Sequence, residues 1–250
     1  MTESKTSNDK YSIIIPYRNR EDHIRVLLPR LQEFFSGKDF EIIVSEQTDK
    51  NPFNISCVQN VAYKYCSGNV IVLNQVDYYP LDDVSYEIHD QPILPANKGI
   101  FINKDLETRR EIKDIPAGYR NWENGIDPNF YGGVIVMRRE HWENINGLNP
   151  MYEGWGNEDE DLRERFKWAG YKPIRNKVGT FLCLYHEDNG NIGVLNKSLQ
   201  KSFIDGRKLL GEAEKYKHIG YKNLSADVKV FDCGIENVKW IKSTNYKIDF

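Results

Sequence analysis

The sequence predicts an α/β protein with a mostly parallel central sheet and helices on both faces of that sheet. Short apolar runs rich in β-branched residues are typical of buried strands, and three occur early in the chain, at residues 11–16, 41–45 and 69–73. Between them, residues 21–35 and 55–65 carry apolar side chains at helical spacing. Strands and helices that alternate in this way form parallel strands joined by right-handed crossovers.

Length and composition favour one substantial core. The chain has 250 residues, of which 40% are apolar, and its 34 basic and 37 acidic residues leave a formal charge of -3. No overall field would attract nucleic acid or anionic lipid, so we expect no nucleic-acid partner. No stretch approaches the roughly 18 consecutive apolar residues of a membrane span, and the first ten residues lack the apolar segment of a signal peptide. Four cysteines without a CxxC pair fit a reducing compartment, and we expect a soluble, cytoplasmic protein of undetermined oligomeric state.

The rest of the chain divides into clear and unclear segments. Residues 78–127 are rich in Pro, Asp and Asn, and fit either a substrate-covering loop region or a scaffold insertion. Beyond them, helices are expected at 139–144 and from Glu158 to about residue 169, with strands at 134–137 and within 171–185. We predict a disordered N-terminus at 1–10, a main domain at 11–190, and an extension at 191–250 that packs on the same domain as scaffold.

Polar side chains follow the predicted strands. Ligands of parallel sheets bind beyond the carboxyl ends of the strands, which places segments 16–20, 46–47 and 74–77 on one rim. The first segment combines a tyrosine with two arginines, which suits stacking of a uracil ring and contact with phosphate, although a solvated loop has the same composition. Asp77 and His186 each follow a strand, and either one alone is as compatible with a structural role.

A run of four acidic residues, Glu158 to Asp161, opens a predicted helix. Acidic groups there complement the helix dipole, which is a sufficient structural reason for them. The preceding Gly154-Trp155-Gly156 places a large aromatic ring between two flexible residues, where a sugar ring could stack. Glycosyl transfer needs a base for the acceptor hydroxyl and a cation to neutralise the departing diphosphate. The acidic run fits the first need, and Asp77 with His186 fits the second.

An ordered set of motifs spans residues 12–190. In sequence order they are Ile-Ile-Pro-Tyr-Arg-Asn-Arg, Asn-Pro-Phe-Asn, Val-Asp-Tyr-Tyr-Pro, Phe-Tyr-Gly-Gly-Val and Gly-Trp-Gly-Asn-Glu-Asp-Glu-Asp. This set resembles the β-1,4-galactosyltransferase family (glycosyltransferase family 7) and the related galactosyltransferase-like domains of chondroitin-type polymerases. The resemblance implies a GT-A fold, that of nucleotide-diphospho-sugar transferases, for the domain at 11–190. It also implies a UDP-sugar donor, a glycan or glycoconjugate acceptor, Mn2+ with Mg2+ as the alternative, and inversion to a β-linkage, with galactose or N-acetylgalactosamine favoured.

The resemblance also assigns roles to individual residues. The donor site comprises Pro16, Tyr17, Arg18, Arg20, Phe53, Val76, Asp77, Phe130, Gly133 and Trp155. The metal ligands are Asp77, His186 and Cys183, and the acceptor contacts are Trp155, Asp159 and Glu160. The catalytic residues are Asp159, as the base, and Glu158, which contacts the donor sugar.

Four residues depart from the family pattern. Gln75 stands where the family has the first acid of Asp-Val-Asp, Phe130 replaces a tyrosine that helps to discriminate galactose from N-acetylgalactosamine, and Glu160 replaces an aspartate that touches the acceptor. Cys183 replaces a methionine ligand and would favour softer metals. Two alternatives therefore remain: transfer of a different sugar in polysaccharide synthesis, and a non-catalytic module that binds a nucleotide-sugar or glycan, which Gln75 favours.

Overall fold

The computed structural model describes residues 9–115, 117–154, 156–186 and 197–250, with the backbone alone for 197–199. Trp155 and most of the N-terminus that we expected to be disordered lie outside the described residues. Lys10, at the end of that N-terminus, is ordered as the first residue of β1.

The centre of the fold is an eight-stranded sheet in the order β10-β11-β2-β1-β3-β7-β5-β8. Its strands are β1 (Lys10–Tyr17), β2 (Asp39–Gln47), β3 (Val70–Asn74), β5 (Ile93–Leu94), β7 (Val134–Arg138), β8 (Ile174–Arg175), β10 (Leu224–Asp232) and β11 (Val238–Ile248). Strand β1 pairs in parallel with β2 and β3, and β11 pairs in parallel with β2. The exceptions include β7, which is antiparallel to β3. The predicted α/β fold with a mostly parallel sheet is confirmed.

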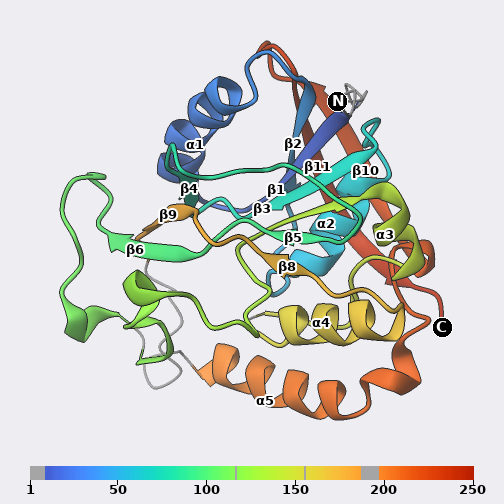
Figure 1. Ribbon diagram of the computed structural model, residues 1–250. Coiled ribbons are helices and arrows are strands. Elements are labelled where there is room, and N and C mark those ends of the chain that lie inside the picture. The colour runs from blue at the N-terminus through green and yellow to red at the C-terminus, as the bar shows by residue number, and fades with distance from the viewer. Residues whose placement is uncertain (1–8, 116, 155, 187–196) are drawn as a thin grey trace, which may run out of the picture.

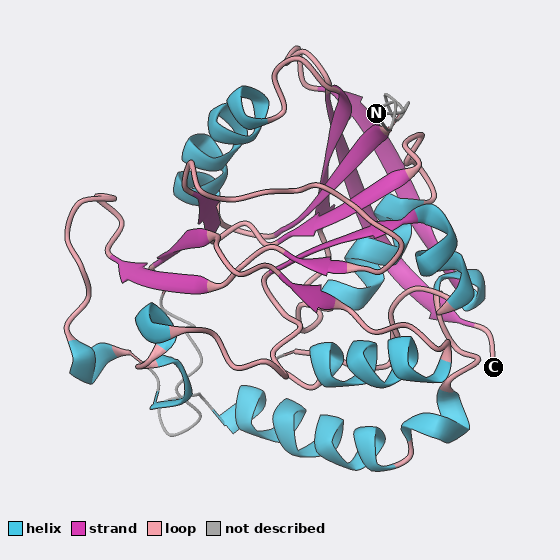
Figure 2. Ribbon diagram, viewed as in Figure 1, coloured by secondary structure: helices cyan, strands magenta, loops and turns pink. Residues whose placement is uncertain are grey.

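Helices cover both faces of this sheet, as Figures 1 and 2 show. The α-helices are α1 (Glu21–Phe34), α2 (Ile55–Tyr63), α3 (Arg139–Asn144), α4 (Glu158–Trp168) and α5 (Lys197–Gly211). Helix α1 lies on one side of the sheet, α2 and α3 lie on the other, and α4 runs beside α5. In the described part of the chain, no helix is both long enough and apolar enough to span a membrane.

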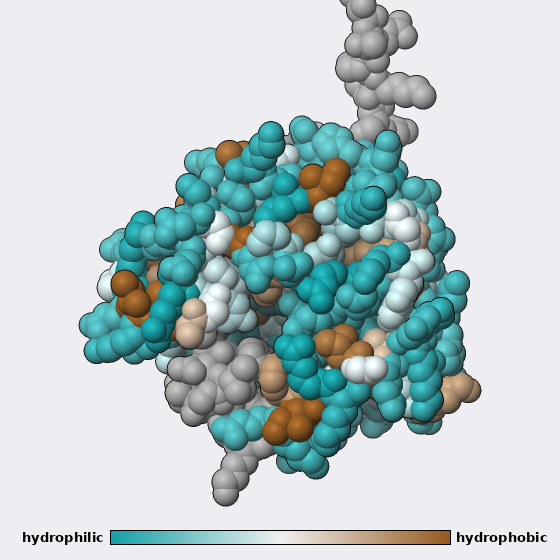
Figure 3. Space-filling model, turned by 60° about the horizontal axis from the view of Figure 1, so that its bottom comes forward, coloured by the Kyte–Doolittle hydropathy of each residue, from teal (hydrophilic) through white to brown (hydrophobic). Residues whose placement is uncertain are grey.

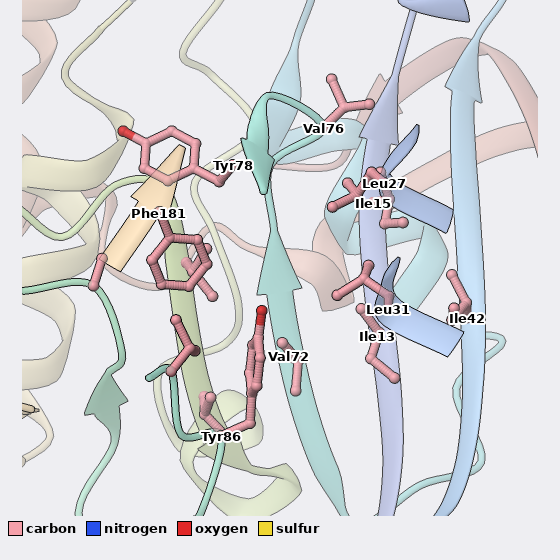
Figure 4. Packing of buried hydrophobic residues seen from close by; sticks show 14 of the residues in the cluster. Ile13, Ile15, Leu27, Leu31, Ile42, Val72, Val76, Tyr78, Tyr86 and Phe181 are labelled. Atoms are coloured by element: carbon pink, nitrogen blue, oxygen red, sulfur yellow. The ribbon is translucent and has the colours of Figure 1, made fainter. Parts of the chain in front are cut away.

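Alternation along β1 fills two separate hydrophobic cores. Ile13 and Ile15 face α1 and pack near Leu27 and Leu31 (Figure 4), whereas Ile14 faces the opposite side, where α2 packs. All three isoleucines are fully buried. A strand buried on both faces has a continuous apolar run, which explains why the sequence signal here was strong. Each buried side chain of this size contributes about 1.5–3 kcal/mol to folding.

Residues 78–127, for which we predicted no helices or strands, form short strands and 3-10 turns. This segment contains β4 (Tyr78–Pro80), β5, β6 (Lys98–Ile102) and the 3-10 turns η1 (Ile112–Asp114), η2 (Ala117–Tyr119) and η3 (Trp122–Asn124). Strands β4 and β6 flank β9 (Thr180–Leu184) in a second, three-stranded sheet. Elements of two to five residues are too short to show a period.

The C-terminal segment joins the main sheet. After α5 come the 3-10 turns η4 (Ala213–Tyr216) and η5 (Tyr221–Asn223), and then the hairpin of β10 and β11. Lys239 on β11 forms an ion pair at 2.6 Å with the buried Glu41 of β2. Glu41 also accepts hydrogen bonds from the Ser12 hydroxyl at 2.7 Å and the Ser67 backbone N–H at 2.5 Å. Burial alone would raise the pKa of Glu41. The contact with Lys239 and the hydrogen bonds from Ser67 and Ser12 together outweigh burial and lower the pKa to about 2.

We expect Glu41→Gln to lower the free energy of unfolding by about 3 kcal/mol at neutral pH, since each pKa unit is worth ~1.36 kcal/mol. The folded-state pKa lies below the unfolded value, so this stability is present above the unfolded pKa of 4.5 and is lost as the pH falls towards 2. Urea unfolding of wild type and variant at neutral and acidic pH measures the difference. An equal difference at both pH values would contradict the assignment.

The matched control is Asp39→Asn, at the end of the same strand. Asp39 pairs with Lys10 at 3.9 Å, and its side chain is 69% exposed. Solvent screens such a pair, so the control should cost less than about 1 kcal/mol.

Candidate active site

The carboxyl ends of β1, β2 and β3 share one edge of the sheet, which we call the rim (residues 16–20, 46–54, 74–77 and 130–133). Tyr17 at the end of β1 is in register with Glu46 of β2. Strand β7 runs antiparallel to β3 and therefore begins where β3 ends. The backbone N–H of Gln75 donates to the carbonyl of Gly133 at 2.9 Å, which closes the rim between the two strands.

The structure brings together two of the residues predicted to contact the nucleotide. The Arg18 guanidinium lies 5.0 Å from the centroid of the Phe53 ring and donates to the carbonyl of Asn51 at 2.7 Å. Pro16 and Tyr17 are the last residues of β1, and the Tyr17 ring packs edge-on against Trp240 at 5.0 Å. An aromatic ring beside a guanidinium at a strand end is suited to a base and a phosphate, as the sequence predicted.

Asp77 and His186 lie side by side although 109 residues separate them. His186 Nε2 is 3.3 Å from Asp77 Oδ2, and His186 Nδ1 is 3.2 Å from a guanidinium nitrogen of Arg20. A guanidinium only donates hydrogen bonds, so Nδ1 accepts and Nε2 carries the proton that faces Asp77. Burial opposes ionisation of Asp77, but the hydrogen bond with His186 and the further interactions with His186, a backbone N–H and His23 together lower the pKa of the carboxyl.

These two side chains have the chemistry of a partial metal site. A carboxylate oxygen and an imidazole nitrogen both suit Mn2+, and a cation between them would replace the Nε2 proton. Among the described residues, no three His, Cys, Asp or Glu side chains are gathered to hold a metal ion. A cation here would need further ligands, and the phosphates of a substrate commonly provide them.

Cys183, the third predicted ligand, lies in the hydrophobic core. It is 3% exposed and belongs to the same cluster as Phe181, near Gly99. Burial raises the pKa of its thiol well above the ordinary value, and the charge of Asp77 raises it further. A neutral thiol is a poor ligand, so the role of Cys183 stays a prediction.

The glycine pair before β7 makes room for side chains at the centre of the site. A Cβ atom at Gly132 would lie 2.6 Å from the Phe130 ring and 3.4 Å from Asp159 Oδ2. Gly133 has a positive φ of 83° and touches the Tyr78 ring, so a side chain there would be both strained and obstructed. Glycine at these positions thus lets the Phe130 ring approach the backbone beside Asp159.

Helix α4 presents the acidic run. It begins after Asn157, which is buried in the left-handed conformation with φ 76°. Asp159 accepts a hydrogen bond from the backbone N–H of Glu160 at 3.0 Å. In the same first turn, the fully buried Asp161 forms an ion pair with Arg165 at 2.5 Å. Arg165 also donates to the carbonyl of Ile219 at 2.7 Å, which ties α4 to the C-terminal segment.

The acids of α4 repel one another. Burial raises the pKa of Glu158 to about 7, and the charge of Glu160 adds to the effect. Burial and the charge of Glu158 raise the pKa of Asp159 well above its ordinary value. Carboxyl groups with raised pKa values in a cleft are candidates for proton transfer.

A pocket of about 30 Å³ gathers the central residues. Its lining includes Gln75, Gly132, Gly133, Glu158 and Asp159, which come from the segment after β3, the segment before β7 and the start of α4. A larger groove of about 440 Å³ lies between the start of α2 and the β10–β11 hairpin, and contains none of the predicted site residues. The face formed by α4 and α5 is largely hydrophilic, with apolar residues in separate small groups (Figure 3).

Sequence reasoning missed residues that reach the site from other elements. Arg207 of α5 forms an ion pair with Glu160 at 3.1 Å. Tyr119 of η2 also lies near the acids. Burial raises the pKa of its hydroxyl, and the charges of Asp159 and Glu158 raise it further. No local pattern in the C-terminal segment indicates that Arg207 pairs with Glu160. Trp155, predicted in both donor and acceptor sites, lies outside the described residues.

Comparison with solved structures identifies the class of protein. A mutant of Drosophila β1,4-galactosyltransferase 7, in complex with manganese, UDP-Gal and xylobiose, superposes with a TM-score of 0.70. The match has 24% sequence identity and covers 97% of this chain and 95% of that one. The catalytic domain of the same enzyme with xylobiose superposes with a TM-score of 0.68. The chain therefore has the GT-A fold that its motifs implied.

Sequence comparison identifies the family. Residues 3–88 match the model of the N-terminal region of glycosyl transferase group 7, and residues 120–187 match a model described as the N-terminal domain of galactosyltransferase. The chain belongs to this glycosyltransferase group 7 family.

Curated relatives carry related names. Beta-1,4-galactosyltransferase 4 of Mus musculus is 32% identical over 192 residues, which is 73% of this chain and 50% of the relative. Beta-1,4-galactosyltransferase 6 of Mus musculus is 28% identical over 213 residues, 79% of this chain and 50% of the relative. A beta-1,4-N-acetylglucosaminyl-transferase of Lymnaea stagnalis, which acts on a beta-N-acetyl-D-glucosaminide, is 34% identical over 82% of this chain and 40% of the relative. The chain spans about half the length of the galactosyltransferases that it matches.

The electrostatics of α4 give a prediction that does not depend on activity. In Glu158→Gln, we expect the pKa of Asp159 to fall, because a neighbouring negative charge is removed while burial is kept. Carbon-13 NMR titration of the labelled carboxyl groups measures this. In the wild type, Glu158 should titrate near a pKa of about 7. Ordinary pKa values for both acids, or no change in the variant, would contradict the coupling.

Proposed function

We propose that this chain is an inverting, metal-dependent glycosyltransferase. It moves galactose or N-acetylgalactosamine from a UDP-sugar to a hydroxyl of an acceptor glycan and forms a β-linkage. The observation that carries the proposal is the geometry of the rim, where Asp159 lines one pocket with Gln75 and the glycine pair, and Asp77 follows Gln75 two residues later. Membership of the glycosyltransferase family and the names of the relatives support this chemistry.

Asp159 is the proposed base. Its carboxylate takes the proton of the acceptor hydroxyl as that oxygen attacks the anomeric carbon of the donor. The new bond forms on one face while the bond to the diphosphate breaks on the other, so the configuration inverts. A carboxylate with a raised pKa accepts a proton more readily than an ordinary one. Glu158 contacts the donor sugar beside it, and Glu160 contacts the acceptor.

The other end of the reaction needs stabilisation of the leaving diphosphate. Asp77 and His186 are the proposed protein ligands of Mn2+ or Mg2+, and a bound cation neutralises charge that develops on the diphosphate. Arg20, which contacts His186, places a guanidinium at the same point. The uridine and its phosphates contact the rim through Pro16, Tyr17, Arg18 and Phe53. Val76, between Gln75 and Asp77, forms part of the same donor site.

The donor sugar depends on the residues around the glycine pair. Phe130 is half-buried, with its ring 4.8 Å from Trp122 and packed against Gly132. Its ring has no hydroxyl with which to contact the sugar. The Lymnaea relative carries N-acetylglucosaminyl-transferase in its name, so that sugar belongs among the donors to be compared. The cytoplasmic location stays a prediction.

The decisive assay is release of UDP from a panel of UDP-sugars with Mn2+, with and without mixed acceptor sugars. We expect one preferred donor, and at least about a hundredfold loss of turnover in Asp159→Asn, the scale of general-base removal. UDP binding, followed by calorimetry, should persist in Asp159→Asn and weaken in Asp77→Ala when Mn2+ is present. Asp205→Asn, an exposed carboxylate on α5 that pairs with Lys208, is the control and should keep wild-type turnover.

Two outcomes would contradict the proposal. Undiminished turnover in Asp159→Asn would contradict the assignment of Asp159 as the base. Mn2+-dependent UDP binding without turnover of any donor and acceptor would favour the non-catalytic binding module instead.

A separate substitution tests Cys183. Because its thiol is buried in the core, we expect Cys183→Ala to lower the free energy of unfolding by about 1–2 kcal/mol, through lost packing. We expect its Mn2+ affinity to stay within about twofold of the wild type, since the thiol packs among apolar side chains of the core. Titration of Mn2+ against the folded variant measures this. A loss of tenfold or more, with the fold intact, would establish Cys183 as a ligand.

A further inference from the structure

We propose that His23 is a positioning residue for the metal site, because it fixes the backbone next to His186 and so sets where the His186 imidazole lies. The inference rests on the proposed function, specifically on Asp77 and His186 as metal ligands. His23 comes from the first turn of α1, and no motif or assigned role included it.

The contact between His23 and the chain before His186 is direct. His23 Nε2 lies 3.0 Å from the carbonyl oxygen of Tyr185. A carbonyl only accepts, so Nε2 carries a proton and donates it. The residue is 5% exposed, and burial lowers the pKa of the imidazole. The hydrogen bond from Nε2 to the Tyr185 carbonyl is therefore shielded from solvent.

The backbone near His186 needs such an anchor because its strand has ended. Strand β9 stops at Leu184, whose N–H donates to the carbonyl of Asp77 at 2.9 Å. The next carbonyl along, that of Tyr185, is held by His23. The next side chain, that of His186, contacts Asp77 and Arg20. Residues 184–186 are thus held by the segment after β3, which carries Asp77, and by the start of α1, which carries His23 and follows Arg20.

The His23 ring also limits the orientation of the His186 ring. The two centroids are 6.2 Å apart and the ring planes are inclined by 67°. This edge-on arrangement leaves Nε2 of His186 directed at Asp77. Residues that orient a metal ligand without touching the metal commonly contribute 10- to 100-fold to metal affinity.

A buried histidine elsewhere in the fold provides a matched control. His141 of α3 is 1% exposed and accepts a hydrogen bond from the backbone N–H of Arg138 at 3.2 Å. It packs against Tyr171, with ring centroids 4.5 Å apart, and contacts none of the proposed metal ligands in the described structure. Replacing it costs a buried hydrogen bond and packing, as replacing His23 does, so any general loss of stability is matched.

The test is Mn2+ affinity of the full chain with UDP present, whose phosphates can complete the coordination, and without a sugar donor. It is measured from the electron paramagnetic resonance signal of free Mn2+ during titration, against a blank that contains UDP alone. The variants are His23→Phe, which keeps an aromatic ring without the donor, His23→Gln, whose amide keeps a donor, and His141→Phe. We expect the dissociation constant to rise about 10- to 100-fold in His23→Phe and to stay within about threefold in His23→Gln and His141→Phe. Thermal unfolding of each variant confirms that it is folded at the titration temperature.

The outcomes separate this inference from the proposed function. A wild type that binds no Mn2+, or whose affinity survives Asp77→Ala, would overturn the metal site and the inference together. Mn2+ binding that requires Asp77 but is unchanged in His23→Phe would overturn only the role of His23. Equal weakening in His23→Phe and His141→Phe would also overturn it, because general loss of stability would then explain the effect. If His23→Phe does not fold, His23→Ala under the same titration takes its place.

Discussion

The candidate site depends on the antiparallel pairing of β3 with β7. Because β7 begins where β3 ends, with Asn74 opposite Val134, the segment that leaves one strand faces the segment that enters the other. Asp77 follows the first strand and the glycine pair precedes the second. The hydrogen bond from Gln75 to Gly133 fixes their separation. A parallel strand at this place would begin at the far edge of the sheet and would leave the two halves of the site apart.

The acidic start of α4 is held from outside the sheet. The ion pair of Asp161 with Arg165 is completely buried, and a buried charge is tolerated only when it is paired and hydrogen-bonded. Arg165 meets this condition through the carbonyls of Ile145 and Ile219, which belong to different segments. Asn157 donates to the carbonyl of Phe203 in α5 at 3.1 Å. The C-terminal segment thus fixes the helix that carries the proposed base, in addition to its place in the sheet.

The sequence predicted the elements with long, regular patterns and the residues with a motif. Strand β1 and helix α1 were predicted within one or two residues, because their apolar side chains repeat at the period of the structure. The pairing of Asp77 with His186 was first indicated by their places after strands and then assigned through the family motif, since nothing local connects residues 109 positions apart. His23 and Arg207 act through contacts between distant elements and carry no local signal. The short strands of residues 78–127 depend on tertiary contacts that no period records.

The rim and the start of α4 keep two acidic groups in opposite electrostatic states, and this difference separates their proposed roles. Asp77 has a lowered pKa because His186 stabilises its charge, whereas Asp159 has a raised pKa because burial and Glu158 oppose its charge. A permanently ionised carboxylate suits a cation, and one with a raised pKa suits a proton. If both acids had the environment of Asp77, neither would be a strong base; if both had that of Asp159, a cation would compete with protons. The division of charge between the strand end and the helix start is therefore what the proposed mechanism needs, because it must stabilise a leaving group and activate a nucleophile in one site.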